Sequence, residues 1–121
     1  MGVRILNVQQ FLEALSGARL DFRESADSVV VGVASAPFML PDSRRAAFCF
    51  VNLSLNDMYL RPNGAASATK GIRVGPSGGS LVALATEIGI ITGYEWQAIA
   101  TAAASSYYLI EALISSAPAG S

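Results

Sequence analysis

The sequence predicts a mainly β protein: an antiparallel β-sandwich of jelly-roll type with a short N-terminal helix. Two observations predict this fold. Short segments rich in β-branched and aromatic residues follow one another from Leu20 to Leu113, separated by Gly, Pro, Asn and Ser at the spacing typical of sandwiches and small barrels. Before Leu20, the apolar residues recur with the period of an α-helix. We therefore expect an arm with a short helix over residues 1–19, a β-sandwich domain over residues 20–114 and a flexible tail over residues 115–121.

The predicted helix begins at about Val8 and ends at about Ser16. Four apolar residues fall on one side of it, at positions i, i+3, i+4 and i+7: Val8, Phe11, Leu12 and Leu15. Asn7 is placed to cap its first turn, and Gly17 is placed to end it. A helix of about nine residues does not persist alone in water, so its apolar stripe has to lie on a larger surface.

That surface is either the protein's own β domain or a neighbouring subunit. The segments from Leu20 onward contain enough apolar residues to close a core without the helix. We therefore expect the arm to serve attachment to a neighbour more than folding. The residues expected at this assembly interface are Leu6, Phe11, Leu12 and Leu15.

The expected strands are short. They cover residues 20–23, 28–34, 45–53, 57–60, 71–74, 80–85, 88–92, 95–101 and 107–113. The segments 28–34 and 45–53 are apolar on both faces, which is typical of strands that are covered on both sides. Ser54-Leu55-Asn56 predicts a hairpin turn, and the Ala-rich residues 102–106 are expected to form a loop rather than a helix.

Charged residues are scarce in this chain. They make up 14% of its 121 residues, whereas globular domains average about 25%. Much of the surface must then consist of apolar, Ser, Thr and Gly residues, which suits a domain whose faces are covered by neighbouring proteins. A net charge of -1 without a basic cluster argues against nucleic-acid binding, and no apolar stretch reaches the length of a membrane span.

The residue types available for catalysis are also few. The chain has no histidine and one cysteine, so it lacks the commonest general base and cannot form a thiolate zinc site. We expect no enzymatic activity, no cofactor and no metal. Cys49 lies in the apolar run Phe48-Cys49-Phe50-Val51 and is expected to fill the core as a small hydrophobic residue.

Two sets of residues are open to both a functional and a structural interpretation. The carboxylates Glu87, Glu95 and Glu111 offer an acid/base pair of the glycosidase kind, but a structural role is favoured, with Glu111 pairing with Arg44 or Arg45. The second set is aromatic and offers a platform for stacking on sugars, although such residues are more often anchors of a core or an interface. It consists of Tyr94, Trp96, Tyr107 and Tyr108.

Seven stretches between Leu40 and Glu111 form a familiar series. They are Leu40-Pro41-Asp42-Ser43-Arg44-Arg45, Phe48 to Ser54, Met58-Tyr59-Leu60, Gly71-Ile72-Arg73-Val74, Gly78-Gly79-Ser80-Leu81, Trp96 to Ala100 and Tyr108-Leu109-Ile110-Glu111. The series resembles small β-sandwich proteins of tailed bacteriophage particles, in which an Arg-led strand ending in Asn-x-Ser precedes a Tyr-containing strand, a Gly-Ile strand and a closing strand ending in Glu. The predicted helix and the strand from Val29 to Val33 precede these stretches and depart from that pattern.

The resemblance implies a structural protein of a virus particle, assembled in the host cytoplasm. Its first candidate role is a capsid cement or decoration protein, and its second is a tail, fibre or baseplate component. The partners it implies are other virion proteins, the major capsid protein above all. The scarcity of charge adds the expectation of a homo-oligomer, with a trimer favoured. A carbohydrate-binding module built on the same sandwich is the alternative from another functional class.

Overall fold

A computed structural model describes residues 20–114 of the chain. These residues form nine strands in two antiparallel sheets and one short helical region. The strands are β1 (Leu20–Glu24), β2 (Val30–Val31), β3 (Ala36–Met39), β4 (Arg45–Asn52), β5 (Met58–Pro62), β6 (Ile72–Val74), β7 (Ser80–Leu84), β8 (Trp96–Ala100) and β9 (Ser105–Ile114). The helical region consists of α2 (Ala85–Ile88) and the 3-10 turn η1 (Gly89–Gly93). The prediction of a mainly β protein is therefore confirmed.

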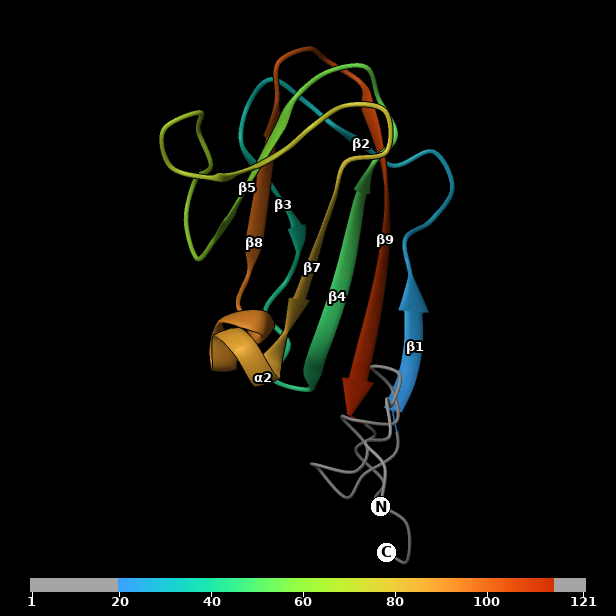
Figure 1. Ribbon diagram of the computed structural model, residues 1–121, viewed down its shortest axis with the longest axis vertical. Helices are drawn as coiled ribbons and strands as arrows, with labels where there is room; N and C mark the ends of the chain where they lie inside the picture. The colour runs from blue at the N-terminus through green and yellow to red at the C-terminus, as the bar shows by residue number, and fades with distance from the viewer. Residues whose placement is uncertain (1–19, 115–121) are drawn as a thin grey trace, which may run out of the picture.

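The larger sheet has the strand order β1-β9-β4-β7 (Figure 1). β1 pairs with residues 110–114 of β9 and β2 pairs with residues 105–106, so the two short strands follow one another along β9. The smaller sheet has the order β3-β8-β5-β6. β4 pairs with β7 on one edge and with β9 on the other, so it is a central strand of its sheet.

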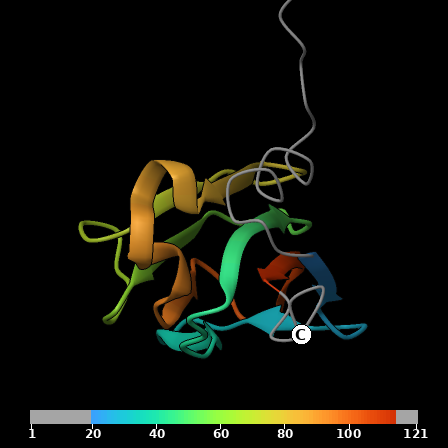
Figure 2. The same cartoon turned by 90° about the horizontal axis from the view of Figure 1, so that it is seen from below.

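One hydrophobic cluster draws residues from both sheets and holds the sheets together. Phe48 of β4 meets Trp96 of β8 edge to face, with ring centroids 4.9 Å apart. Phe50 stacks on Tyr107 of β9 at the same centroid distance. Fully burying an apolar side chain contributes about 1.5 to 3 kcal/mol, so this cluster contributes strongly to the stability of the domain. β3, β5 and β8 lie to one side of β4, β9 and β1 in two perpendicular views (Figures 1 and 2).

A buried asparagine at the end of β4 ties the two sheets together. The Nδ2 group of Asn52, a residue with 0% exposure, donates to the carbonyl oxygens of Asn56 at 2.7 Å and of Val74 in β6 at 3.0 Å. Its Oδ1 atom accepts from the backbone N–H and the hydroxyl of Ser54, at 2.9 and 2.7 Å. Every hydrogen-bonding group of this amide therefore has a partner, and the burial leaves none of them unpaired.

Two edge strands differ from the sequence predictions. Only Val30 and Val31 of the predicted strand 28–34 form a strand, and Val30 and Val33 are 53% and 59% exposed. The expectation that this strand is covered on both sides is wrong, because β2 lies at a sheet edge and pairs with β9 alone. The sequence did not predict β3. This strand contains Pro37, a residue that an edge strand tolerates.

The strand predicted for residues 88–92 is also wrong, because these residues are helical. Their carbonyl groups bind side chains instead of a neighbouring strand. The Ile91 oxygen accepts from Trp96 Nε1 at 3.1 Å and the Thr92 oxygen accepts from Arg45 at 3.2 Å. The helical region that the structure describes thus lies at Ala85–Gly93 rather than at the N-terminal end, and the helix predicted for residues 8–16 falls outside the described residues.

The two predicted connections have different outcomes. Ser54-Leu55-Asn56 is not a hairpin turn, because β4 and β5 belong to different sheets and the segment crosses between them. Residues 102–104 form the expected loop, with Ala104 at a φ of 56°, and β9 begins at Ser105.

Candidate functional site

The side of the larger sheet that faces away from the core is apolar. Its residues alternate with the core residues along each strand, and the strand registers align them in rows. In one row, Cys49 of β4 lies between Val82 of β7 and Ile110 of β9. We call this surface the outer face. Its apolar residues are Leu20, Phe22, Ala47, Cys49, Val51, Val82, Leu84, Tyr108, Ile110 and Ala112, and the registers place Glu24 and Ser80 on the same side.

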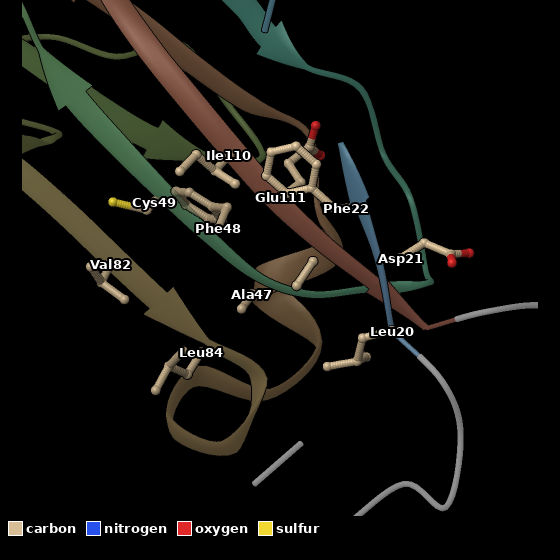
Figure 3. A pocket seen from close by; sticks show the side chains of 11 residues that line it. Leu20, Asp21, Phe22, Ala47, Phe48, Cys49, Val82, Leu84, Ile110 and Glu111 are labelled. Atoms are coloured by element: carbon tan, nitrogen blue, oxygen red, sulfur yellow. The ribbon is translucent and has the colours of Figure 1, made fainter. Parts of the chain in front are cut away.

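Part of the outer face forms a hollow of about 280 Å³ across β1, β9, β4 and β7. Figure 3 shows the side chains of Cys49, Val82 and Leu84 beside one another on the neighbouring strands β4 and β7. Apart from Asp21 and Glu111, every residue that lines the hollow is apolar. Its walls therefore offer hydrophobic contact and very few hydrogen-bonding groups.

The outward side of the smaller sheet has a different composition. It carries polar and charged residues among apolar ones, namely Tyr59, Arg61, Arg73, Gln97 and Ile99. On the outer face, by contrast, the charged residue among the described strands is Glu24, whose carboxylate accepts a hydrogen bond from the Tyr108 hydroxyl. Phe22 and Val82 are nevertheless 66% and 54% exposed. The domain thus has one apolar side that its described residues leave uncovered.

Cys49 lies on this face, so the prediction that it fills the core is wrong. Phe48 and Phe50 take the core positions of β4, and the alternation of the strand turns the residue between them outward. The Cys49 side chain is half-buried, and burial raises the pKa of its thiol. At neutral pH the group is therefore protonated and a weak nucleophile.

Glu111 is bound by two arginines at the edge of the hollow. Its Oε2 atom accepts from Arg45 Nε at 2.6 Å, and both of its oxygens accept from Arg23, at 2.9 and 3.0 Å. Burial raises the pKa of Glu111, but the hydrogen bonds from Arg23 and Arg45 outweigh this effect and hold the pKa below its usual value. The predicted pairing with Arg45 is confirmed, whereas Arg44 pairs with Asp42 at 3.1 Å.

Arg45 joins the two sheets at the start of β4. The side chain is buried and also donates to the carbonyl oxygens of Leu40, Thr92 and Tyr94, at 2.7, 3.2 and 3.0 Å. Leu40 follows β3 and Tyr94 precedes β8, and both of these strands belong to the smaller sheet. A buried polar residue therefore stands at each end of β4, and together the two fix the position from which the outer face projects.

The sugar-stacking platform offered by the aromatic residues is not formed around Trp96. This residue is 1% exposed, and its ring packs on Phe48 in the core. Tyr107 is likewise stacked on Phe50, whereas Tyr108 lies on the outer face. The tryptophan is therefore unavailable for stacking on a sugar.

The four residues predicted for the assembly interface, Leu6, Phe11, Leu12 and Leu15, lie outside the described residues. The outer face itself was not predicted. Its signal was the two-sided apolar pattern of residues 45–53, which was interpreted as burial within the domain. Residues 80–84 and 107–113 share this pattern, and the pairing of the three segments assembles the face.

Over residues 20–114, no group of three or more Cys, Asp or Glu side chains is placed to hold a metal ion. Within the same range no helix is long and apolar enough to cross a membrane. No family model matches the sequence, and the comparisons with curated proteins and with solved structures give no match.

Replacement of Glu111 by Gln is expected to lower the free energy of unfolding by about 3 to 5 kcal/mol, because it leaves the buried Arg45 without its counter-charge. Urea unfolding measures this loss. Asp57→Asn is the matched control. It breaks the Arg73–Asp57 pair, whose side chains are 60% and 31% exposed, and it should cost less than about 1 kcal/mol. Equal losses in the two variants would show that the buried Arg45–Glu111 pair contributes no more to the free energy of unfolding than the exposed Arg73–Asp57 pair.

The stability is expected to fall in acid. Glu111 has a lowered pKa in the folded state, so its contribution is complete above the unfolded value of 4.5 and is lost as the pH falls through the folded pKa. The chain has no histidine, so its stability should change little between about pH 5 and 8. Urea midpoints at pH 7, 5 and 3 test this, with Glu111→Gln as the reference. A fall as steep in the variant as in the wild type would assign the acid sensitivity to other groups.

Proposed function

We propose that this protein is a non-enzymatic structural subunit of a virus particle, of the capsid cement or decoration type, which acts through protein–protein contacts. The observation that carries the proposal is the apolar outer face. Single exposed hydrophobic residues are ordinary, but contiguous apolar patches of more than a few hundred Å² are rare on monomeric proteins and mark interaction surfaces. Here four adjacent strands contribute such residues side by side.

The strand order supports assignment of the domain to the jelly-roll β-sandwiches. With β1 and β2 taken as one interrupted strand, the chain forms two sheets of four strands, ordered β1-β9-β4-β7 and β3-β8-β5-β6. Jelly rolls have eight strands in two sheets and serve as viral capsid and lectin domains, among others. One fold can host many functions, so the jelly-roll assignment is compatible with a virion role but does not indicate it. The proposal of a virion role rests on the apolar outer face.

The chemistry of the described residues supports a role without catalysis. The carboxylate of Glu111 is occupied by Arg45 and Arg23, and that of Asp42 by Arg44. The Cys49 thiol has a raised pKa and lies among apolar side chains. These groups are arranged to hold the structure rather than to activate a nucleophile.

A tail, fibre or baseplate component would need the same kind of apolar contact surface. It would differ from a cement or decoration protein in its place on the particle. The carbohydrate-binding alternative loses its main support with the burial of Trp96. The proposed partners are the major capsid protein and further copies of this chain, with a trimer favoured. Light scattering at neutral pH tests the oligomer, for which the expected mass is a multiple of the 12.6 kDa chain.

Mass spectrometry of purified virus particles is expected to detect this chain, and replacement of Val51 by Lys is expected to lower its copy number at least tenfold. Val51 projects from the outer face of β4 beside Tyr108. A lysine there would carry a charge into the contact, and burying an unpaired charge costs several kcal/mol.

The matched control is Ile99→Lys, which places the same charge at a half-buried, outward position of the smaller sheet. Equal incorporation of the two variants would contradict the assignment of the outer face as the contact surface. A particle that lacks the wild-type chain would contradict the virion setting itself. Thermal unfolding of both variants establishes that each is folded.

A further inference from the structure

The hollow of the outer face lies where the described part of the chain begins. Leu20, the first residue of β1, is one of the residues that line it. Residues 1–19 precede Leu20, and the sequence predicts in them one short helix with an apolar stripe. A hollow that the described residues leave uncovered and a predicted apolar stripe that needs a host surface are thus joined by only a few residues of chain.

We propose that the helix predicted for residues 8–16 lies in the hollow of the same molecule, with Phe11, Leu12 and Leu15 against the outer face. The sequence pattern by itself favours a neighbouring subunit as the host of this helix. The position of the hollow favours the protein's own domain.

The dimensions of the two elements agree. A nine-residue helix is about 13.5 Å long at 1.5 Å per residue. The four strands β1, β9, β4 and β7 span three spacings of about 4.8 Å, which is about 14 Å. One short helix is therefore long enough to cross the sheet that forms the hollow.

The connection is also suitable. Gly17 is placed to end the helix, and residues 17–19 remain to join it to Leu20. Connections of 2 to 6 residues between a helix and a following strand are typical of packed helix–strand units. Binding through so short a link is intramolecular, with an effective concentration in the millimolar range, so the arm of the same molecule outcompetes other copies at ordinary protein concentrations.

The chemistry of the two surfaces matches as well. The lining of the hollow is apolar apart from Asp21 and Glu111, and the stripe of the helix consists of apolar side chains. The helix covers the part of the outer face around Cys49 and Val82. Val51 and Tyr108 lie outside this hollow and stay open to a partner, so the Val51→Lys variant probes a part of the outer face that the helix does not cover.

Cys49 is the only cysteine of the chain and lines the hollow, so its rate of reaction with a thiol reagent reports whether the hollow is covered. The triple replacement Phe11→Ser, Leu12→Ser and Leu15→Ser is expected to speed the reaction of Cys49 with Ellman's reagent at least tenfold. The matched control Gln9→Ser, Glu13→Ser and Ala14→Ser changes the other side of the predicted helix and should leave the rate within twofold of wild type. Equal rates in all three proteins would overturn the proposal.

A second measurement separates the arm of the same molecule from that of another copy and does not depend on the folding of the triple variant. In a Leu12→Cys variant, mild oxidation is expected to form a disulfide between residue 12 and Cys49 within one chain, which keeps the monomer mass on a non-reducing gel. Glu13→Cys, on the opposite side of the helix, should form this bond at least tenfold more slowly. Disulfide-linked dimers would place the arm on a second copy, and no preference for residue 12 would show that the apolar stripe does not face the hollow. Either result overturns the proposal.

Discussion

The arrangement of the domain depends on strand β4, which is held at each end by a buried polar side chain. At its start, Arg45 binds Glu111 of β9 and three carbonyl oxygens beside the strands of the smaller sheet. At its end, Asn52 binds Val74 of β6 and the loop that follows β4. The core residues Phe48 and Phe50 lie between these two positions. These contacts hold the two sheets in their separation and register, because breaking them would leave the buried polar groups of Arg45 and Asn52 without partners.

The same strand explains why the protein has a second apolar surface. The residues of β4 that alternate with Phe48 and Phe50 are Ala47, Cys49 and Val51, and β7 and β9 place further apolar residues beside them. A strand inside a single two-layered domain needs apolar residues on one face alone. An apolar second face predicts a third layer, and the described residues do not supply it. We propose that the arm supplies this layer over the hollow and that a partner protein supplies it over the rest of the outer face.

The sequence predicted most of the strands because their alternation and their punctuating Gly, Pro and Asn residues are local signals. It also offered Arg44 or Arg45 as the partner of Glu111, of which the structure selects Arg45, and it placed Arg45 at the start of a strand. It failed where the outcome depends on tertiary contacts. Residues 88–92 are helical, and the carbonyl groups of Ile91 and Thr92 accept hydrogen bonds from the side chains of Trp96 and Arg45. β3 is a strand in spite of Pro37, which its position at a sheet edge tolerates. The outer face was missed because a two-sided apolar pattern does not say what covers the second side.

Oxidative footprinting of the full chain in solution, with side-chain modification read by mass spectrometry, tests most directly whether the outer face is covered. Phe22 and Val82 lie on the outer face and are 66% and 54% exposed, while Leu40 and Leu55 lie elsewhere and are 70% and 83% exposed. If the outer face is an interface, Phe22 and Val82 will be modified much more slowly than Leu40 and Leu55 after correction for the intrinsic reactivity of each residue type. Modification of all four residues in proportion to these exposures would contradict the account, because it would show that the outer face is open to water.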